Sequence, residues 1–434
     1  MAWTNWAGDE SCTPAVVERP GSVEELSAAV KRAAAADRTV RVVGAGHSFG
    51  DLVSTSGTLI SLDGLAGLLD VDASTGLVQV AAGTRLHDLN PLLAQHGLAL
   101  PNLGDIDRQS VAGAISTATH GTGRLLGNLA TQVESLELVL ADGSVLAVTD
   151  PETLRAARVS IGALGVVSAC TLRAVPAFRL RAENRKLPLA ETLARLDELV
   201  DGNDHFEFFA LPHTDLALTK ANNRTDEPVH RPGRVRQYLA GPVVENRVVD
   251  ALSRLGRAKP ARIPRLNRLL GRLVSDSTRV EDSFRVFANQ RDVRFTESEW
   301  ALPRDACAAV VRDVLDVIKR RDLDVNFPLE VRFVAGDEES FLSPSFGRET
   351  AYVAVHVYRG MDWRPYFQAV QDIASAHGGR PHWGKRHLLD ADSLAPRYPA
   401  WDRFQAVRAR LDPEGRFTND HVRRVLGPTN GDTR

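Results

Sequence analysis

Residues 39–50 read TVRVVGAGHSFG, an apolar stretch typical of a strand, followed by a glycine-rich loop with one histidine, His47. Glycine has no Cβ and tolerates positive φ, so such a loop lets the backbone approach a ligand closely, and its N–H groups can bind phosphate. A Rossmann fingerprint requires a third glycine three residues after the second, but Phe49 occupies that position. The loop favours a pyrophosphate-bearing cofactor on a different scaffold, although a strand–loop connection without a ligand has the same pattern.

A second stretch, residues 110–123 (SVAGAISTATHGTG), consists almost entirely of small residues. A purely structural core would use larger side chains to fill its volume. Small hydroxyl residues beside glycine instead suit a backbone that packs against a flat or phosphorylated ligand. His120 in this stretch is either a ligand contact or a hydrogen-bonded histidine of a turn, and the residue types alone do not distinguish the two.

Two predicted strands carry acids, bases and cations. In LEVRFV, Glu330 and Arg332 share one face because strand side chains alternate. In YVAVHVY, His356 shares its face with Tyr352 and Tyr358, and valines occupy the other face. Such faces suit a pocket for a substrate with several hydroxyl groups, or a surface sheet with cross-strand ion pairs.

The segment RPHWGK, residues 380–385, combines an aromatic residue, a glycine and titratable groups. It either delivers Lys385 as a cation into a site or forms a turn that packs Trp383. The chain contains no Walker A loop, no G-x-S-x-G, no H-E-x-x-H and no C-x-x-C. We therefore predict no metal site, and other common phosphate and nucleophile motifs are excluded.

The first part of the chain alternates predicted helices and strands, which indicates an α+β domain that ends near Pro176. Ser22 and the acidic residues after it predict a capped helix through Ala36. The other predicted elements are a strand at 38–43, two strands within 68–82, a helix at 86–96, a hairpin at 134–148 with an Asp142-Gly143 turn, and a strand within 161–175.

The second half predicts strands at 203–219, 284–296, 328–334 and 350–358, and helices at 301–321 and 363–377. Residues 253–272 form a basic stretch. This stretch is interpreted as a solvated helical face; a contact for anionic lipid or for a protein electron acceptor is the alternative.

Composition sets outer limits on function. At 434 residues the chain predicts two or three domains. Its net charge of −2 gives no general attraction to nucleic acid or membranes. Three widely spaced cysteines and an N-terminus without signal-peptide character predict a reducing, cytoplasmic location. No apolar run is long enough to span a bilayer.

The combination of TNWAG near the N-terminus, VVGAGHSF, SVAGAISTATHGTG, the Glu330/Arg332 pair and RPHWGK resembles the aldonolactone oxidoreductases. This family contains sugar-1,4-lactone oxidases and dehydrogenases, with alditol oxidases, in the vanillyl-alcohol-oxidase flavoprotein superfamily. The resemblance implies an α+β fold with an N-terminal PCMH-type FAD-binding domain over residues 1–176. A cap domain with an antiparallel sheet flanked by helices follows at 177–379, then a segment at 380–425 that returns to the FAD domain, and a disordered tail at 426–434.

The resemblance also implies site residues. His47 matches a histidine that carries FAD covalently in many members, and Glu330, Arg332, His356 and Lys385 match the substrate pocket. The other implied cofactor-binding residues are Val43, Gly44, Ala45, Gly46, Ser48 and Phe49 in the first loop, Ser110, Val111, Gly113, Thr117, Thr119, His120 and Gly121 in the second stretch, and Val167 near the adenine.

The implied activity is oxidation of an aldono-1,4-lactone of the L-gulono or D-arabinono type at its C2 hydroxyl, with hydride transfer to flavin N5 and electrons passing to O2 or another acceptor. Arg332 and Lys385 would stabilise developing negative charge. Glu330 and His356 are both possible bases; our hypothesis is that Glu330 orients substrate hydroxyls and His356 is nearer the proton.

Two positions depart from the family pattern. Tyr358 stands where alditol oxidases have threonine, which favours a lactone-oxidising type, and Ala118 replaces an expected glycine beside the flavin. The alternatives are an alditol oxidase, a flavoprotein of the same fold that oxidises a natural-product alcohol, and a nonredox sugar-binding protein that has lost its cofactor.

Overall fold

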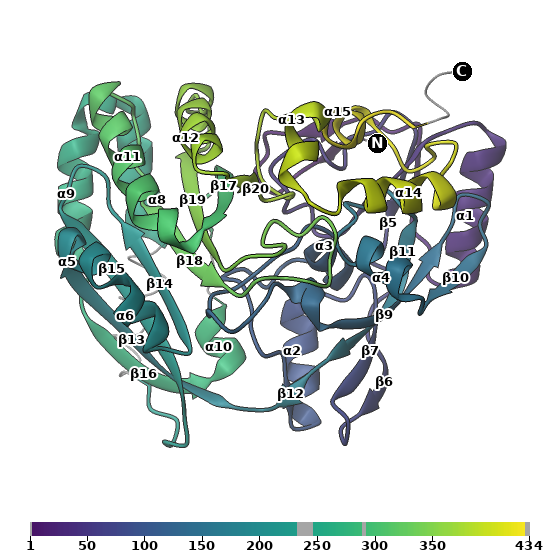
Figure 1. Ribbon diagram of the computed structural model, residues 1–434, viewed down its shortest axis with the longest axis horizontal. Coiled ribbons are helices and arrows are strands. Elements are labelled where there is room, and N and C mark those ends of the chain that lie inside the picture. The colour runs from purple at the N-terminus through teal and green to yellow at the C-terminus, as the bar shows by residue number, and fades with distance from the viewer. Residues whose placement is uncertain (1, 232–245, 289–291, 430–434) are drawn as a thin grey trace.

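The computed structural model describes residues 2–231, 246–288 and 292–429 (Figure 1). The first part of the chain contains two larger sheets and two short strand pairs. A parallel sheet has the order β3–β5–β4, with bounds Val16–Glu18, Thr58–Ser61 and Val40–Val43. An antiparallel sheet has the order β10–β9–β11–β7–β6, with bounds Val145–Val148, Val133–Val139, Val166–Arg173, Leu77–Ala81 and Leu68–Asp72.

The remaining elements of the first part are short strand pairs and helices. Strand β1 (Trp3–Thr4) pairs with β2 (Ser11–Cys12), and β8 (Leu98–Ala99) pairs with β12 (Val175–Pro176). The helices are α1 (Val23–Ala35), α2 (Leu86–Gln95), α3 (Val111–Ser116) and α4 (Pro151–Arg158). This mixture of helices with a parallel and an antiparallel sheet confirms the predicted α+β class.

Helix α1 forms where its sequence predicts it. The Ser22 hydroxyl accepts a hydrogen bond from the Glu25 N–H at 3.2 Å, which caps the helix. Glu24 and Glu25 lie in the first turn, where carboxylates interact favourably with the helix dipole. Leu26 and Val30 are among the buried residues of its apolar face, so burial of this stripe stabilises the helix beyond its cap.

The second part is built on one eight-stranded antiparallel sheet, which confirms the predicted cap architecture. Its order is β16–β13–β15–β14–β18–β19–β17–β20, with bounds Ser277–Asp282, Arg179–Pro188, Leu216–Thr225, His205–Ala210, Leu329–Val334, Thr350–Tyr358, Phe295–Pro303 and Arg380–Pro381. Its helices are α5 (Leu189–Ala194), α6 (Leu196–Asp201), α8 (Val249–Ala258), α9 (Ile263–Leu273), α10 (Ser283–Phe287), α11 (Cys307–Arg320) and α12 (Arg364–Ala376).

Strands β18 and β19 are buried along their whole lengths. Helix α11 contacts β19 and lies with α5 and α6 on the outer side of the sheet (Figure 1), while the first part of the chain lies on the other side. A polar residue on the inner face, such as His356, is therefore buried between the two parts of the chain. The alternative interpretation of these strands, a surface sheet with cross-strand ion pairs, is therefore wrong.

The C-terminal segment lies against the first part of the chain (Figure 1). It contains α13 (Ala391–Leu394), α14 (Trp401–Leu411) and α15 (Asp420–Leu426). The Val40 N–H donates to the Arg416 carbonyl at 2.8 Å, and the buried Arg41 guanidinium donates to the Phe417 carbonyl at 2.7 Å. These contacts join the segment to strand β4, which precedes the glycine-rich loop. The domain boundaries at 176 and 379 stay predictions.

Three predicted elements differ from the structure. Residues 284–287 lie in helix α10, because Val286 and Phe287 are buried side by side in one helical turn rather than alternating as in a strand. Residues 301–303 continue β17, and the helix begins only at Cys307. Leu426, assigned to the disordered tail, is buried in α15, whereas residues 430–434 of that predicted tail lie outside the described residues.

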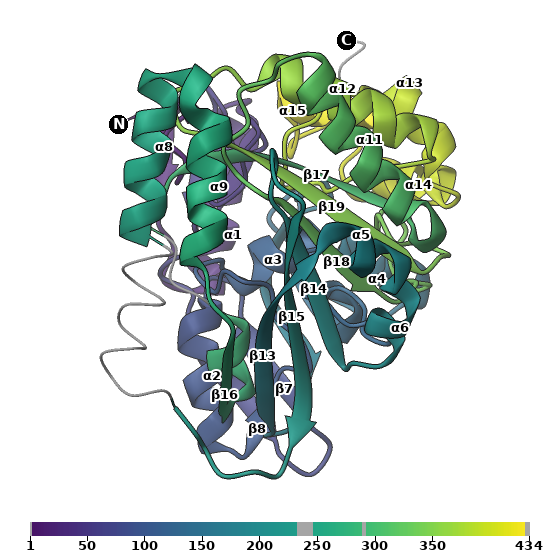
Figure 2. The same ribbon diagram turned by 90° about the vertical axis from the view of Figure 1, so that its left-hand side faces the viewer.

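The basic stretch 253–272 forms parts of α8 and α9, which pack against each other (Figure 2). Its arginines are exposed, as expected for a solvated helical face. The three cysteines, Cys12, Cys170 and Cys307, are free. Among the residues described, no helix is both long and apolar enough to cross a membrane.

Candidate active site

The glycine-rich loop and the small-residue stretch line one cavity together. Of the predicted cofactor-binding residues, those in this lining are Gly44, Ala45, Gly46, His47, Ser48, Ser110, Gly113, Thr117, Thr119 and Val167. A Cβ on Gly44 would lie 2.1 Å from the Ser110 Oγ, so only glycine lets the two segments meet. Ser110 in turn caps α3 by accepting from the Gly113 N–H at 3.2 Å. The cavity is therefore built from backbone and small side chains, as the binding of a large flat cofactor requires.

His47 is half-buried and lines this cavity. Its ring stacks on Trp6, with ring centroids 5.2 Å apart. Burial, with the nearby positive charges of Lys385, Arg85 and Arg108, lowers the pKa of His47 to about 4. Its Nδ1 is buried and has no hydrogen-bond partner among the described residues. At neutral pH His47 is thus an uncharged imidazole with an unused nitrogen inside a cofactor-sized cavity.

Five other predicted cofactor residues lie outside the lining. Val43 packs with Val53 and Leu59, Val111 lies in the main core, and Phe49 stacks on Phe295. A Cβ on Gly121 would lie 2.3 Å from the Leu103 carbonyl oxygen, so this glycine serves backbone packing. His120 lines a second, adjoining cavity instead.

The second cavity brings together all four residues predicted for the substrate pocket, Glu330, Arg332, His356 and Lys385. Lys385 and Thr119 line both cavities. Lys385 therefore lies at the junction between them, with its Nζ also 4.9 Å from the centre of the Phe49 ring. The junction is where a bound substrate would meet the reactive part of a cofactor.

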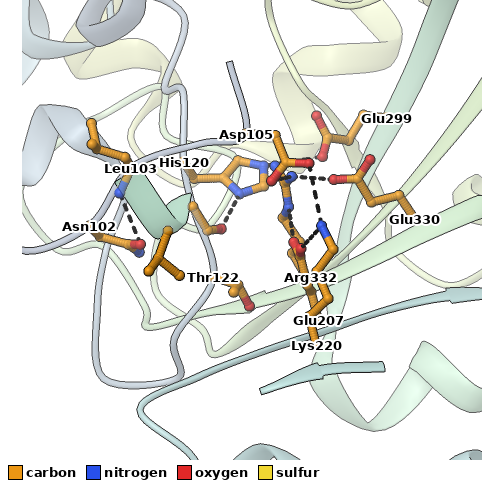
Figure 3. Close-up of polar contacts among 12 residues, drawn as sticks. Asn102, Leu103, Asp105, His120, Thr122, Glu207, Lys220, Glu299, Glu330 and Arg332 are labelled. Atoms are coloured by element: carbon orange, nitrogen blue, oxygen red, sulfur yellow. Dashed lines mark hydrogen bonds and ion pairs between the residues drawn. The ribbon is translucent and has the colours of Figure 1, made fainter. Parts of the chain in front are cut away.

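Arg332 is held by three carboxylates (Figure 3). Its Nη2 lies 2.6 Å from Asp105 Oδ1, its Nε donates to Glu207 Oε2 at 2.9 Å, and it also contacts Glu330. Lys220 lies 2.9 Å from the other oxygen of Glu207. These three charge-assisted contacts, made by two of its nitrogens, hold the guanidinium group in place, so Arg332 presents a rigid positive charge.

His356 lies next to this cluster. Its Nδ1 lies 3.4 Å from the Pro328 carbonyl oxygen, which can only accept, so this nitrogen carries the proton of the neutral ring. The Nε2 faces Glu297 Oε1 at 3.6 Å and Glu330 Oε2 at 3.9 Å. The free lone pair of His356 is therefore on Nε2, between two carboxylates that would stabilise an added proton.

Lys385 is positioned by the turn that contains it. The Trp383 ring is buried, and its indole N–H donates to the Leu342 carbonyl at 2.6 Å. The Gly384 N–H donates to Nδ1 of His382 at 3.0 Å. These contacts direct the Lys385 Nζ to Glu297 Oε2 at 2.5 Å. Both interpretations of RPHWGK thus hold: the turn packs its tryptophan and also delivers the cation.

In the part of the chain that the structure describes, two groups of side chains have the composition of metal ligands, but neither suits a metal. Asp105, Glu207 and Glu330 surround the Arg332 guanidinium, which already supplies the cation. In the other group, His382 accepts a hydrogen bond at Nδ1, so its Nε2 carries a proton and has no lone pair for a metal.

Several residues in or next to the second cavity have no counterpart among the sequence predictions. Asp105, Glu297, Glu299 and His382 line the cavity, and Glu207 and Lys220 lie behind Arg332. Glu297 and Glu299 had a usable signal, because alternate acids in TESEW give a strand the same acidic face as Glu330 gives LEVRFV. Asp105 had none, since it lies in a loop and meets Arg332 only through the fold. Tyr358, expected near the substrate, lies outside the lining, and its hydroxyl donates to Asp250 at 2.8 Å.

Comparison with known proteins shows the family of this chain. A family model described as D-arabinono-1,4-lactone oxidase matches residues 170–425, and one described as FAD binding domain matches residues 14–149. The L-gulono-1,4-lactone dehydrogenase of Mycobacterium tuberculosis is 50% identical over 427 residues, which cover 98% of this chain and 99% of that protein. The L-gulonolactone oxidase of Bos taurus is 32% identical over 436 residues, 98% of each chain.

Among solved structures, a solvent-stable cholesterol oxidase superposes with a TM-score of 0.85, covering 98% of this chain and 97% of that chain. Its sequence is only 18% identical, so this likeness supports the fold alone. Together with the FAD binding domain match over residues 14–149, this likeness confirms the predicted FAD-binding fold.

Proposed function

Because this chain belongs to the D-arabinono-1,4-lactone oxidase family, an FAD-dependent group of oxidoreductases that act on CH–OH groups, we propose that it oxidises an aldono-1,4-lactone of the L-gulono or D-arabinono type at the C2 hydroxyl. One observation carries the proposal. The cavity lined by the glycine-rich loop meets a polar cavity at Lys385, and the second cavity gathers Glu330, Arg332 and His356.

The first cavity fits FAD. The loop Gly44–Ser48 offers backbone N–H groups for the pyrophosphate, and Ser110 and Gly113 keep the facing wall thin. When bound there, the flavin supplies a hydride acceptor. We further propose that His47 is the covalent attachment point, through its Nδ1. The support is that this nitrogen is buried, unpartnered and uncharged at neutral pH, because only a neutral imidazole has a lone pair available for bond formation.

In the second cavity each side chain has a distinct task. Nε2 of His356 accepts the proton of the substrate hydroxyl, because its lone pair is free and two carboxylates stabilise the imidazolium that forms. Glu330 orients substrate hydroxyls and keeps Arg332 in place. Arg332 and Lys385 stabilise negative charge that develops on the substrate oxygen.

The test is reduction of the flavin in the purified holoprotein, mixed without oxygen with L-gulono-1,4-lactone, D-arabinono-1,4-lactone or xylitol. We expect either lactone to bleach the visible flavin absorbance faster than xylitol does. Faster bleaching by xylitol would identify an alditol oxidase, and no bleaching by any of them would favour the natural-product alcohol alternative. A colourless protein that does not bind added FAD would leave only the nonredox sugar-binding alternative.

The electron acceptor in this proposal is O2 or another oxidant, and reoxidation rates with O2 and with an artificial acceptor distinguish an oxidase from a dehydrogenase. A cytoplasmic location is supported by the three free cysteines. Peripheral contact with anionic lipid through the basic stretch 253–272 is supported only by its exposed arginines. The test is to compare binding of the protein to anionic vesicles with its binding to neutral vesicles.

A further inference from the structure

A continuous chain of charged side chains runs along the wall of the second cavity and beyond it. Figure 3 shows the part of it around Arg332, with Asp105, Glu207, Lys220 and Glu330. Each member contacts the next within ion-pair distance, and each carboxylate lies between groups that carry or can carry a positive charge. In order, the members are His120, Glu299, Lys385, Glu297, His356, Glu330, Arg332, then Asp105 and Glu207 together, and Lys220. We call this set the charge chain.

His120, at one end of the charge chain, holds two protons by hydrogen-bond accounting. Its Nδ1 lies 2.8 Å from the Gly121 carbonyl oxygen, which only accepts, so Nδ1 carries a proton. Its Nε2 lies 3.2 Å from Oε1 of Glu299, with both side chains buried. A ring protonated only at Nδ1 would direct a lone pair at the carboxylate, so a second proton must lie between Nε2 and Glu299.

The surroundings place this second proton on the histidine. Burial alone would raise the pKa of Glu299, but His120, Lys385 and His382 together lower it well below its usual value. Burial lowers the pKa of His382 itself to about 3, so that residue is neutral. Tyr352, which stacks on His120 with ring centroids 3.6 Å apart, also stays neutral, because burial raises its pKa. His120 is thus an imidazolium and Glu299 a carboxylate.

The charge chain then lacks one positive charge. It contains five carboxylates and the fixed cations Lys220, Arg332 and Lys385, and protonated His120 makes four cations. One more proton on His356 balances the set. The contacts distinguish the two histidines, because the His120 nitrogens lie 2.8 and 3.2 Å from their partners, whereas those of His356 lie 3.4 to 3.9 Å from theirs.

We propose that His120 and Glu299 form a fixed imidazolium–carboxylate pair, a positioning device that leaves His356 as the one group of the charge chain that exchanges a proton during turnover. The role of His356 rests on the proposed function. In the step concerned, the O–H bond of the substrate breaks and its proton moves to His356 Nε2; FAD, when bound in the first cavity, would supply the acceptor for the hydride and its electron pair. When His356 is protonated, the net charge of the charge chain is zero. His356 therefore accepts the proton without leaving a net charge beside the second cavity.

The pair acts through its net charge, which is zero. Replacing His120 by glutamine leaves Glu299 uncompensated, and the extra negative charge favours His356 in its protonated form, which cannot accept the substrate proton. Replacing Glu299 by glutamine instead lets His120 release its second proton, because the carboxylate that held this proton is gone. The net charge of the residue pair 120/299 then stays zero. The two variants should therefore differ, although they break the same contact.

The first measurement is the pH profile of flavin reduction by the lactone. For His120→Gln we expect the acid limb to move up by about one pH unit, the effect of one charge across a protein-like medium. For Glu299→Gln we expect less than half that shift, and for the double variant a limb close to that of the parent. Equal shifts in the two single variants, or no shift in His120→Gln, would overturn the charge argument.

The second measurement is nitrogen NMR of the holoprotein labelled at histidine. The His120 signals are identified by their loss in His120→Gln. We expect a doubly protonated His120 ring at pH 8 in the parent and a ring protonated at one nitrogen in Glu299→Gln, with His356→Asn as a control that keeps the parent signal. A singly protonated ring in the parent would refute the imidazolium. The NMR measurement needs no turnover. It therefore tests whether His120 and Glu299 form an imidazolium–carboxylate pair even if no lactone is oxidised or a variant loses flavin.

Discussion

Replacing His356 by asparagine tests the assignment of the base. Asparagine keeps a donor for the Pro328 carbonyl but has no group that takes up a proton. Loss of a positioned general base costs about 100- to 10,000-fold in rate. Glu330→Gln removes only one of the two carboxylates that face Nε2, because Glu297 remains at 3.6 Å. A single neighbouring carboxylate shifts proton affinity by about 1–3 pKa units, and we expect a loss of roughly tenfold.

The assay is stopped-flow reduction of the flavin under anaerobic conditions at saturating lactone, so that substrate binding and reoxidation do not contribute. Flavin content is measured first, which separates loss of cofactor from loss of rate. His377→Asn is the matched control, since His377 is half-buried directly after α12 and its Nε2 lies 3.6 Å from Asp313 Oδ2. If Glu330→Gln loses far more rate than His356→Asn, Glu330 is the base and the assignment is wrong.

Three further predictions concern the cofactor, the backbone and pH. If His47 carries FAD covalently, acid-precipitated protein stays yellow and His47→Ala releases the colour to the supernatant; colour released from the parent contradicts the bond. Asp322 follows α11 with φ of +49°, so Asp322→Gly should raise the free energy of unfolding by about 0.5–1 kcal/mol in urea titrations, with Asp322→Ala as the comparison; no gain for glycine would refute strain there. Burial lowers the pKa of His382 from its usual 6.5 to about 3. As the pH falls, His382 is therefore protonated in the unfolded chain before it is protonated in the folded protein. The folded state loses stability relative to the unfolded chain between about pH 6.5 and pH 3 for this reason. Between pH 7.5 and 5 the parent should therefore lose about 2 kcal/mol more stability than His382→Asn, and equal losses would show that His382 does not contribute.

Local signals in the sequence predicted much of the fold. The Ser22 cap, the Asp142-Gly143 turn and the apolar periodicities of α1 and β18 depend on neighbours within a few residues. Prediction failed at residues 284–287, because four residues of alternating type match one helical turn as well as a strand, and only burial of Val286 beside Phe287 distinguishes them. The predicted start of α11 was also wrong, because β17 continues to Pro303 and stays buried as far as Leu302.

By itself, the sequence determined which residue types are available for chemistry and which of them share a strand face, because alternation along a strand is a local property. It placed His47 in a glycine loop and paired Glu330 with Arg332. Only the tertiary structure decided which groups meet. Asp105, in the first part of the chain, contacts Arg332 in the second part. His120 was predicted to bind the cofactor, but it lines the second cavity and contacts Glu299. Contacts between residues so distant in sequence depend on the packing of whole elements, and so does the charge balance that they create.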